Sequence, residues 1–281
     1  MREPSSWRTF AAKCLFAPLA IGGLRRRVVF HVKHRYFPDL GLTVPIGGGL
    51  SCPILAEENM YSFREIFGDR EYAGLAAHLA LPQRWIDLGA HAGYFSLSLA
   101  AQHAAAGTGD AWQAALVEPD PRMLPVIQAG LDRNGIAGQV RLLAGLVGSG
   151  AGEKPFALRG GMLSSASAAD APTEREVAVP VVTELMLLAA LPPPYDLVKV
   201  DIEGGEYDFV RHYGQICRAA RALVMEWHVP SVADGRLAEL RSALQVLGFA
   251  RRVVLREARA GAGEGPLAVT GLDLFLRGQP E

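Results

Sequence analysis

Five ionisable side chains lie at the ends of two apolar segments in the second half of the chain. Asp201, Glu203 and Glu206 follow the first segment, and Glu226 and His228 end the second. An imidazole beside carboxylates can take up or release a proton near neutral pH. The same groups could ligate a divalent metal such as Mg²⁺ or Mn²⁺, but no spacing demands one. We therefore predict proton transfer by His228, Asp201, Glu203 or Glu206, and no metal site.

The first of these segments has a competing structural interpretation. Alternation along a strand would put Lys199, Asp201 and Glu203 on one face. Lys199 could then form a structural ion pair with either carboxylate, because buried charge is costly unless it is paired. In the functional interpretation the two carboxylates lie at the carboxyl edge of a sheet, where open α/β sheets bind ligands.

A glycine turn follows an earlier apolar segment, in Trp-Ile-Asp87-Leu-Gly89-Ala90-His91-Ala-Gly93. A dinucleotide site prefers G-x-G-x-x-G, whose middle glycine admits a pyrophosphate. Here His91 occupies that place, so the turn suits a nucleoside cofactor without phosphates. Asp87 would face a cationic or amino-bearing part of the ligand. The alternative is a structural turn in which Asp87 caps the next helix.

A second apolar strand ends in Glu118, followed by Pro119. An acid at this position can accept hydrogen bonds from both hydroxyls of a ribose. The alternative is a carboxylate in water at a strand end. With the glycine turn before it, Glu118 indicates a ribonucleoside pocket.

The elements that position these residues follow an alternation of short apolar runs and helical stretches, which is typical of a parallel sheet covered on both faces. This pattern predicts a doubly wound α/β fold. We expect strands at Trp85–Leu88, Ala114–Glu118, Val140–Ala144, Leu197–Ile202, Leu223–Trp227, Val253–Leu255 and Leu272–Leu276. We expect helices near 93–104, 121–134, 205–214 and 234–247. The insertion over 150–192 is rich in Ser, Ala and Gly, which predicts a hairpin and a mobile loop.

Composition excludes several classes of protein. The 281 residues carry a net charge of −1 and are half apolar, which excludes a disordered chain and argues against a nucleic-acid binder. The cysteines, Cys14, Cys52 and Cys217, have no paired spacing, so we expect buried, reduced thiols in a cytoplasmic protein.

The first 40 residues are basic, with eight Lys and Arg against two Asp and Glu. The apolar run Cys14–Leu24 is too short to span a membrane. The segment is either an amphipathic anchor on a membrane surface or a helix packed on the domain. We expect a strand at Arg27–Val32, a Gly/Pro-rich stretch over Pro38–Pro53, and helical segments at Met60–Phe67 and Arg70–Ala80.

Three stretches together resemble the FkbM family of S-adenosylmethionine-dependent methyltransferases. They are Trp85–Phe95, Val117–Pro119 and the segment Lys199-Val-Asp-Ile-Glu-Gly-Gly-Glu206. The resemblance implies a class I methyltransferase fold, a seven-stranded sheet whose last strand is reversed, over residues 55–281. Residues 1–54 would form an accessory segment. His91 departs from the Asn expected there, and Gly205 from the usual Ala.

The resemblance also implies the cofactor and the reaction. Asp87 and the turn from Gly89 to Gly93, with Ala90 and His91, would hold the methionine end of S-adenosylmethionine. Glu118 and Pro119 would hold the ribose, and the segment around Gly145 would flank the adenine. The acceptor would be a small hydroxylated molecule, a sugar or secondary metabolite, and the proton would pass to His228 or a neighbouring carboxylate.

Two other functions remain open from the sequence. One is a nucleotide-dependent oxidoreductase, against which the missing middle glycine argues. The other is a non-catalytic module that binds a nucleoside or a protein partner. An open cavity beside Glu118 and Asp201 would count against the second.

Overall fold

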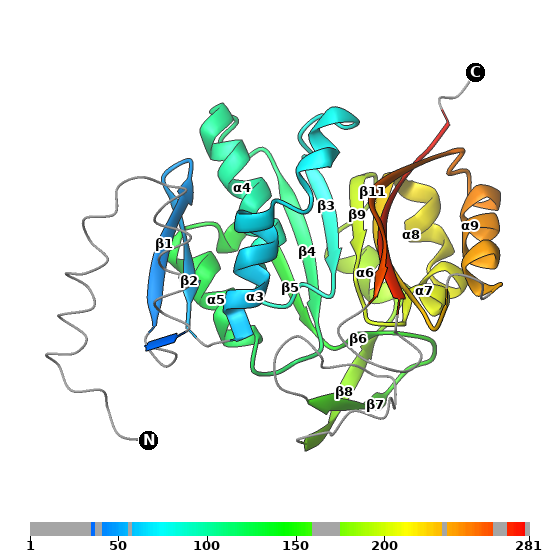
Figure 1. The fold of residues 1–281 in the computed structure, drawn as a ribbon. Helices are drawn as coiled ribbons and strands as arrows, with labels where there is room; N and C mark the ends of the chain where they lie inside the picture. Colours follow the sequence, from blue (N-terminus) through cyan, green and yellow to red (C-terminus); the bar gives the residue numbers. More distant parts are fainter. Residues whose placement is uncertain are drawn as a thin grey trace, which may run out of the picture.

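The computed structural model of the chain describes residues 35–36, 41–55, 58–158, 175–231, 235–260 and 269–278 (Figure 1). The apolar run Cys14–Leu24 and the expected strand Arg27–Val32 lie outside the described residues, as does Cys14. Within the described part of the chain, no helix is both long and apolar enough to cross a bilayer.

A seven-stranded sheet forms the centre of the protein, in the order β11-β12-β10-β9-β3-β4-β5. Neighbouring strands from β10 to β5 pair in parallel, whereas β12 is antiparallel to both β10 and β11. This order confirms the doubly wound α/β sheet predicted from the sequence pattern, and with its reversed last strand it is the class I methyltransferase fold that the resemblance implied. The strands are β3 (Arg84–Leu88), β4 (Gln113–Glu118), β5 (Val140–Ala144), β9 (Tyr195–Val200), β10 (Ala220–Val229), β11 (Arg251–Ala260) and β12 (Val269–Leu276).

Two hydrophobic cores cover the two faces of the sheet, because successive side chains of a strand point to opposite faces. Trp85 and Leu116 belong to the core beneath α4 and α5, whereas Ile86 and Val117 belong to the core beneath the helices from α6 to α9. The helices are α4 (Tyr94–Ala106), α5 (Leu124–Arg133), α6 (Glu184–Ala190), α7 (Glu206–His212), α8 (Gly214–Ala219) and α9 (Arg236–Val246).

An antiparallel hairpin precedes the sheet, where the sequence predicted only a Gly/Pro-rich stretch. It consists of β1 (Leu42–Gly47) and β2 (Leu50–Ile54). That prediction was wrong because the glycines serve the turn between two strands. A Cβ on Gly48 (φ +58°) would lie 2.4 Å from the carbonyl oxygen of Ala101, so this glycine lets the turn pack on α4.

The hairpin is part of the main folded body. Val44 and Cys52 are buried in the same core as residues of α4 and α5. Cys52 and Cys217 are buried free thiols, as expected. The accessory segment predicted over 1–54 therefore remains a prediction for the residues before the hairpin.

The hairpin is followed by α3 (Glu58–Phe63), which continues into a π-helical turn (Arg64–Asp69) and then a 3₁₀ helix (Ala73–Ala77). This confirms helical structure in both segments where the sequence placed it, although the second is shorter than predicted. Aromatic packing holds α3 against α4, because Phe63 meets Tyr94 edge to face at the start of α4.

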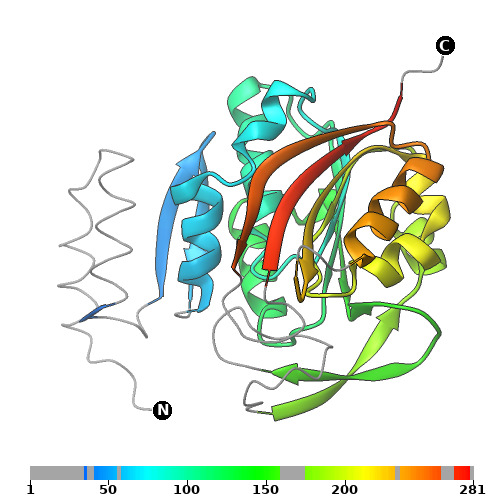
Figure 2. The same ribbon diagram turned by 45° about the vertical axis from the view of Figure 1, so that its right-hand side comes forward.

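The insertion after the third strand of the sheet contains the predicted hairpin, formed by β7 (Glu153–Leu158) and β8 (Arg175–Val182). A short strand, β6 (Leu146–Val147), pairs with β8. In both views the hairpin lies beneath the carboxyl ends of the central strands (Figures 1 and 2). The loop expected within the insertion falls on residues 159–174, outside the described residues. The short helices α6 and α8 were not predicted.

Candidate active site

The carboxyl ends of β3, β4, β5 and β9 surround a cavity of about 340 Å³, and β7 forms its outer wall through Lys154 and Phe156. Seven of the residues predicted to bind the cofactor or to transfer the proton line it: Gly89, His91, Glu118, Pro119, Gly145, Asp201 and Glu203. The other five do not line it: Asp87, Ala90, Gly93, Glu206 and His228.

The glycine turn after β3 needs its glycines for two different reasons. Gly89 (φ +72°) touches the end of β9 so closely that a Cβ would lie 1.7 Å from the carbonyl oxygen of Asp201. Gly93 (φ +74°) has ordinary space for a Cβ but adopts the left-handed conformation that begins α4. The N–H groups of Gly89 and Ala90 both donate to the carbonyl oxygen of Val117, which fixes the turn on β4.

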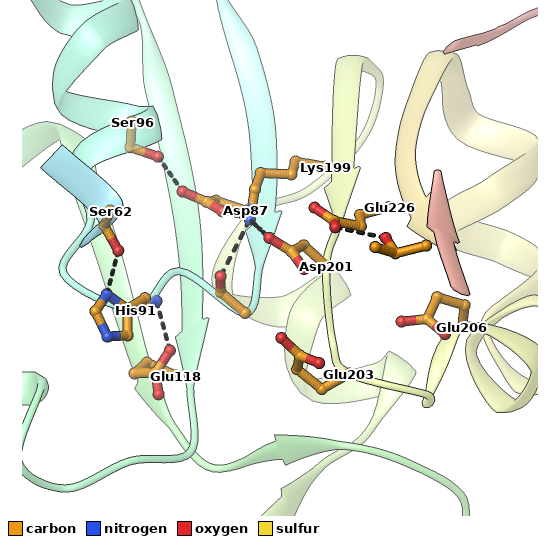
Figure 3. Close-up of polar contacts among 12 residues, drawn as sticks. Ser62, Asp87, His91, Ser96, Glu118, Lys199, Asp201, Glu203, Glu206 and Glu226 are labelled. Carbon is orange, nitrogen blue, oxygen red and sulfur yellow. Dashed lines mark hydrogen bonds and ion pairs between the residues drawn. The ribbon is translucent and has the colours of Figure 1, made fainter. Parts of the chain in front are cut away.

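Asp87 is fully buried beneath this turn. Its carboxylate accepts a hydrogen bond from Ser96 (2.8 Å) and lies 3.3 Å from Nζ of Lys199. Lys199 also pairs with Asp201 at 3.3 Å and donates to the carbonyl oxygen of Gly89 at 3.1 Å (Figure 3). The ion pair that the sequence offered as a structural alternative is thus present. Through it, one buried lysine connects the glycine turn to the end of β9.

Burial and charge act in opposite directions on Lys199. Burial lowers the pKa of its ammonium group, but the carboxylates of Asp201 and Asp87 raise that pKa by more. The net shift is upward, so Lys199 carries a fixed positive charge.

Glu118 lies at the end of β4 and is almost completely buried. One carboxylate oxygen accepts from the backbone N–H of His91 (2.5 Å) and the other from that of Asp120 (2.8 Å). Burial raises the pKa of Glu118 to about 8, and these two hydrogen bonds lower it in part. Because each oxygen has a second lone pair, the group can still bind a diol in the cavity.

His91 closes one side of the cavity. Its φ of +48° is unusual for a residue with a side chain. The ring Nδ1 lies 2.5 Å from Oγ of Ser62 on α3 (Figure 3). Burial lowers the pKa of His91 to about 4, so the ring is neutral at physiological pH.

Gly145 follows β5 and lines the far side of the cavity. Its N–H donates to the carbonyl oxygen of Glu118 at 3.0 Å. At φ +148° a Cβ would lie 2.4 Å from the carbonyl oxygen of Pro180 on β8. Glycine is therefore required for the insertion hairpin to pack against the end of β5.

The acidic residues after β9 converge with His228 on β10. The alternation predicted for Lys199, Asp201 and Glu203 stops early, because β9 ends at Val200 and Glu203 has a φ of +49°. The three side chains nevertheless lie close together. One ligand atom from each of Asp201, Glu203 and His228 lies within 4.8 Å of the others.

Carboxylates surround the His228 ring. Nδ1 lies 3.0 Å from Glu206, while Nε2 lies 3.5 Å from Glu203 and 4.0 Å from Glu226. Burial lowers the pKa of His228, but Glu206 and the other carboxylates raise it to about 10 overall. Burial also raises the pKa of Glu203 to about 8 and that of Asp201 above its ordinary value. His228 therefore holds a proton near neutral pH in the absence of a ligand.

Comparison with known proteins adds the following. No family model and no curated protein matches the chain. Among solved structures it is similar to precorrin-6y C5,15-methyltransferase from Geobacter metallireducens GS-15, with 14% identity, a TM-score of 0.41, and coverage of 75% of this chain and 88% of that chain. It is also similar to the N-terminal domain of EvdMO1, solved in the presence of SAH and D-fucose, with 16% identity, a TM-score of 0.44, and coverage of 75% and 82%. The fold assignment rests on the strand order given above.

Arg256 and Glu71 were not singled out from the sequence. Arg256 on β11 contacts Glu226 at 2.6 Å and Glu71 at 2.8 Å. Both residues line a second cavity, of about 570 Å³, between β11 and the segment that runs from α3 through the π-helical turn to the 3₁₀ helix. Arg256 lies in a run of basic residues that reads as a solvated strand face. No signal in the sequence distinguishes it from Arg251 or Arg252.

Proposed function

We propose that the protein is an S-adenosylmethionine-dependent methyltransferase that methylates a hydroxyl group of a small acceptor, a sugar or secondary metabolite, as the resemblance to the FkbM family implies. The observation that carries the proposal is the position of Glu118. Its carboxylate lies at the end of β4, fixed by two backbone N–H groups, and lines a cavity beside the glycine turn of β3. This is the place at which an acid binds a ribose in a doubly wound sheet.

The lining of the cavity fits this cofactor. Val117, Leu146, Val147 and Phe156 provide apolar surface for an adenine. The acidic lining residues suit a sulfonium cation and a free amino group. They are Glu118, Asp120, Asp201, Glu203 and Asp208.

The same lining disfavours the alternatives. Among the described residues, Lys154 is the one basic side chain that lines the cavity besides neutral His91, so a pyrophosphate would meet mainly carboxylates there. Dinucleotide sites instead use backbone N–H groups at a helix terminus. The cavity beside Glu118 and Asp201 also argues against a non-catalytic module.

The bound cofactor would supply an electrophilic methyl group on sulfur. The acceptor oxygen would form a bond to the methyl carbon as the carbon–sulfur bond breaks, and the hydroxyl proton would pass to a carboxylate. We assign this role to Asp201, because it lines the cavity at the end of β9 and pairs with Lys199. Glu203 lines the cavity too, but burial raises its pKa to about 8, so it holds a proton near neutral pH. His228 is already protonated near neutral pH, so its charge favours a positioning role over that of the base.

Calorimetric titration tests the cofactor assignment. S-adenosylhomocysteine should bind at one site per chain, and NADH should show no binding. Binding of NADH alone would favour the oxidoreductase, and binding of neither would contradict a nucleoside pocket.

Transfer of an isotope-labelled methyl group to a panel of hydroxylated acceptors tests the reaction. The label should appear on oxygen. Transfer to nitrogen in an amine-containing panel, with none to oxygen, would contradict O-methylation.

A further inference from the structure

We propose that Asp201, Glu203 and His228 bind a hard divalent cation, Mg²⁺ or Mn²⁺, at the edge of the cavity. One oxygen from each carboxylate and one ring nitrogen lie within 4.8 Å of one another. Ligands on opposite sides of such an ion are about 4 Å apart, given metal–oxygen distances of about 2.0–2.1 Å. Small side-chain rotations therefore bring all three atoms to bonding distance.

The orientation of His228 is an independent observation that points to a ligand. The side chain is more than nine-tenths buried, and its Nδ1 is taken by Glu206 at 3.0 Å. The other nitrogen, Nε2, faces two carboxylates, 3.5 Å from Glu203 and 4.0 Å from Glu226. A carboxylate on one ring nitrogen with the other directed at oxygen ligands is how proteins orient a metal-binding histidine.

Asp201 is held in a comparable way. Lys199 occupies Oδ2 at 3.3 Å and is itself anchored to Asp87 and to the Gly89 carbonyl. Because the lysine is fixed by three contacts, it holds the carboxylate in place while leaving Oδ1 available. The remaining ligand positions would face the cavity, which Asp201 and Glu203 line.

The local charge balance favours a cation here. His228 would release its ring proton to the solvent on binding the ion, because only a neutral imidazole is a ligand. The carboxylates of Asp87, Asp201, Glu203, Glu206 and Glu226 then outnumber their cationic neighbours Lys199 and Arg256. A divalent ion would offset this excess. Carboxylate and water oxygens are the ligands that Mg²⁺ and Mn²⁺ prefer. The sequence predicted no metal, since spacing alone could not show that these three atoms converge.

The role of the ion rests on the proposed function. A cation at the cavity edge would bind the acceptor hydroxyl and lower its pKa, which assists transfer of its proton to a free carboxylate oxygen. Cation binding itself can be measured without cofactor or acceptor. Failure of the metal site and failure of the methyltransferase assignment are therefore distinguishable.

Mn²⁺ is the probe for the test, because its electron paramagnetic resonance reports both binding and ligands. The full-length wild-type chain, stripped of metal, should bind one Mn²⁺ per chain, and Mg²⁺ should compete for it. Electron spin-echo modulation should show coupling to one imidazole nitrogen. The Asp201→Asn and His228→Gln variants should bind at least ~10-fold more weakly, and Glu206→Gln ~10–100-fold more weakly, the usual effect of removing a group that orients a ligand.

Asp208→Asn is the matched control, because Asp208 lines the same cavity outside the cluster. It should bind Mn²⁺ as the wild type does. Absence of Mn²⁺ binding by the wild type would overturn the proposal, as would binding without nitrogen coupling. The nitrogen coupling is measured on the wild type, so the test holds even if a variant fails to fold.

Discussion

The two sides of the cavity hold buried charge in different ways. The cofactor side, built from Glu118 and the turn around His91, uses backbone N–H groups and glycines. The acidic side, built from Asp201, Glu203 and His228, uses side-chain charges paired with one another. Backbone donors keep one arrangement whatever ligand is present. A carboxylate or imidazole in a side-chain pair can instead give up its partner and bind a proton or a cation.

The two histidines illustrate this difference. Burial, together with the positive charges of Lys199 and Arg122, lowers the pKa of His91 to about 4, although Asp120 raises it in part. Burial also lowers the pKa of His228, but carboxylates on three sides raise it to about 10. The cofactor side therefore holds a neutral ring and the acidic side a charged one, which fits a rigid binding site beside a site of proton or cation chemistry.

We expect the largest effect on stability from substitution of Lys199, which pairs with Asp87 on the cofactor side and with Asp201 on the acidic side. Lys199→Met should lower the free energy of unfolding by about 3–5 kcal/mol, because it leaves the buried carboxylate of Asp87 without its cation. Urea denaturation measures this. Lys154→Met on the cavity wall is the matched control and should change stability by less than about 0.5 kcal/mol. Equal losses in both variants would mean that Lys199 does not join the two sides.

A smaller effect, on cofactor affinity, should distinguish a substitution on the cofactor side from one on the acidic side. Glu118→Ala should weaken S-adenosylmethionine binding by about 1.5–3 kcal/mol, the scale for losing hydrogen bonds to a charged group. Glu226→Gln, on the acidic side but outside the cavity lining, should leave binding unchanged. Calorimetry measures both, and an unchanged dissociation constant for Glu118→Ala would contradict the ribose role.

The pH dependence should differ in sign between the two histidines. His228 has a folded-state pKa above the ordinary value of about 6.5, so its contribution to stability is complete below that pH and is lost as the pH rises towards about 10. The raised pKa of Glu203 acts in the same direction. His91 has a lowered pKa, so its contribution is present above about 6.5 and is lost as the pH falls towards 4.

Nuclear magnetic resonance of labelled histidine rings measures the two titrations directly, with His91→Gln and His228→Gln variants to assign the signals. At pH 7 in metal-free protein, His91 should be neutral and His228 protonated. Two rings that titrate together near the ordinary value would remove the contrast between the two sides.

Much of the fold could be predicted from the sequence, because the parallel strands of the main sheet are apolar runs that alternate with segments of helical periodicity. Val140–Ala144 was predicted with its observed bounds. The β1–β2 hairpin was missed because its glycines and prolines resemble those of an irregular stretch. Pro53 lies within β2, and its carbonyl oxygen accepts a hydrogen bond from the hydroxyl of Tyr94.

The site could be predicted less completely. Because Glu118 and Gly145 each follow or end a predicted strand, the sequence could predict that they lie close together. Their backbones do form a hydrogen bond across adjacent strand ends. Strand-end positions were not enough for Asp87, which lies buried beneath the turn against Lys199. Nor could spacing identify Arg256, whose contact with Glu226 depends on how β11 packs beside β12.

The central claim is that Glu118 and the glycine turn of β3 form the cofactor pocket. A crystal structure of the protein with S-adenosylhomocysteine tests it most directly. We predict the ribose hydroxyls within hydrogen-bonding distance of the Glu118 carboxylate, the adenine beside Gly145, and the sulfur directed at Asp201 and Glu203. A ligand bound in the second cavity beside Arg256, or one whose ribose does not contact Glu118, would contradict the account.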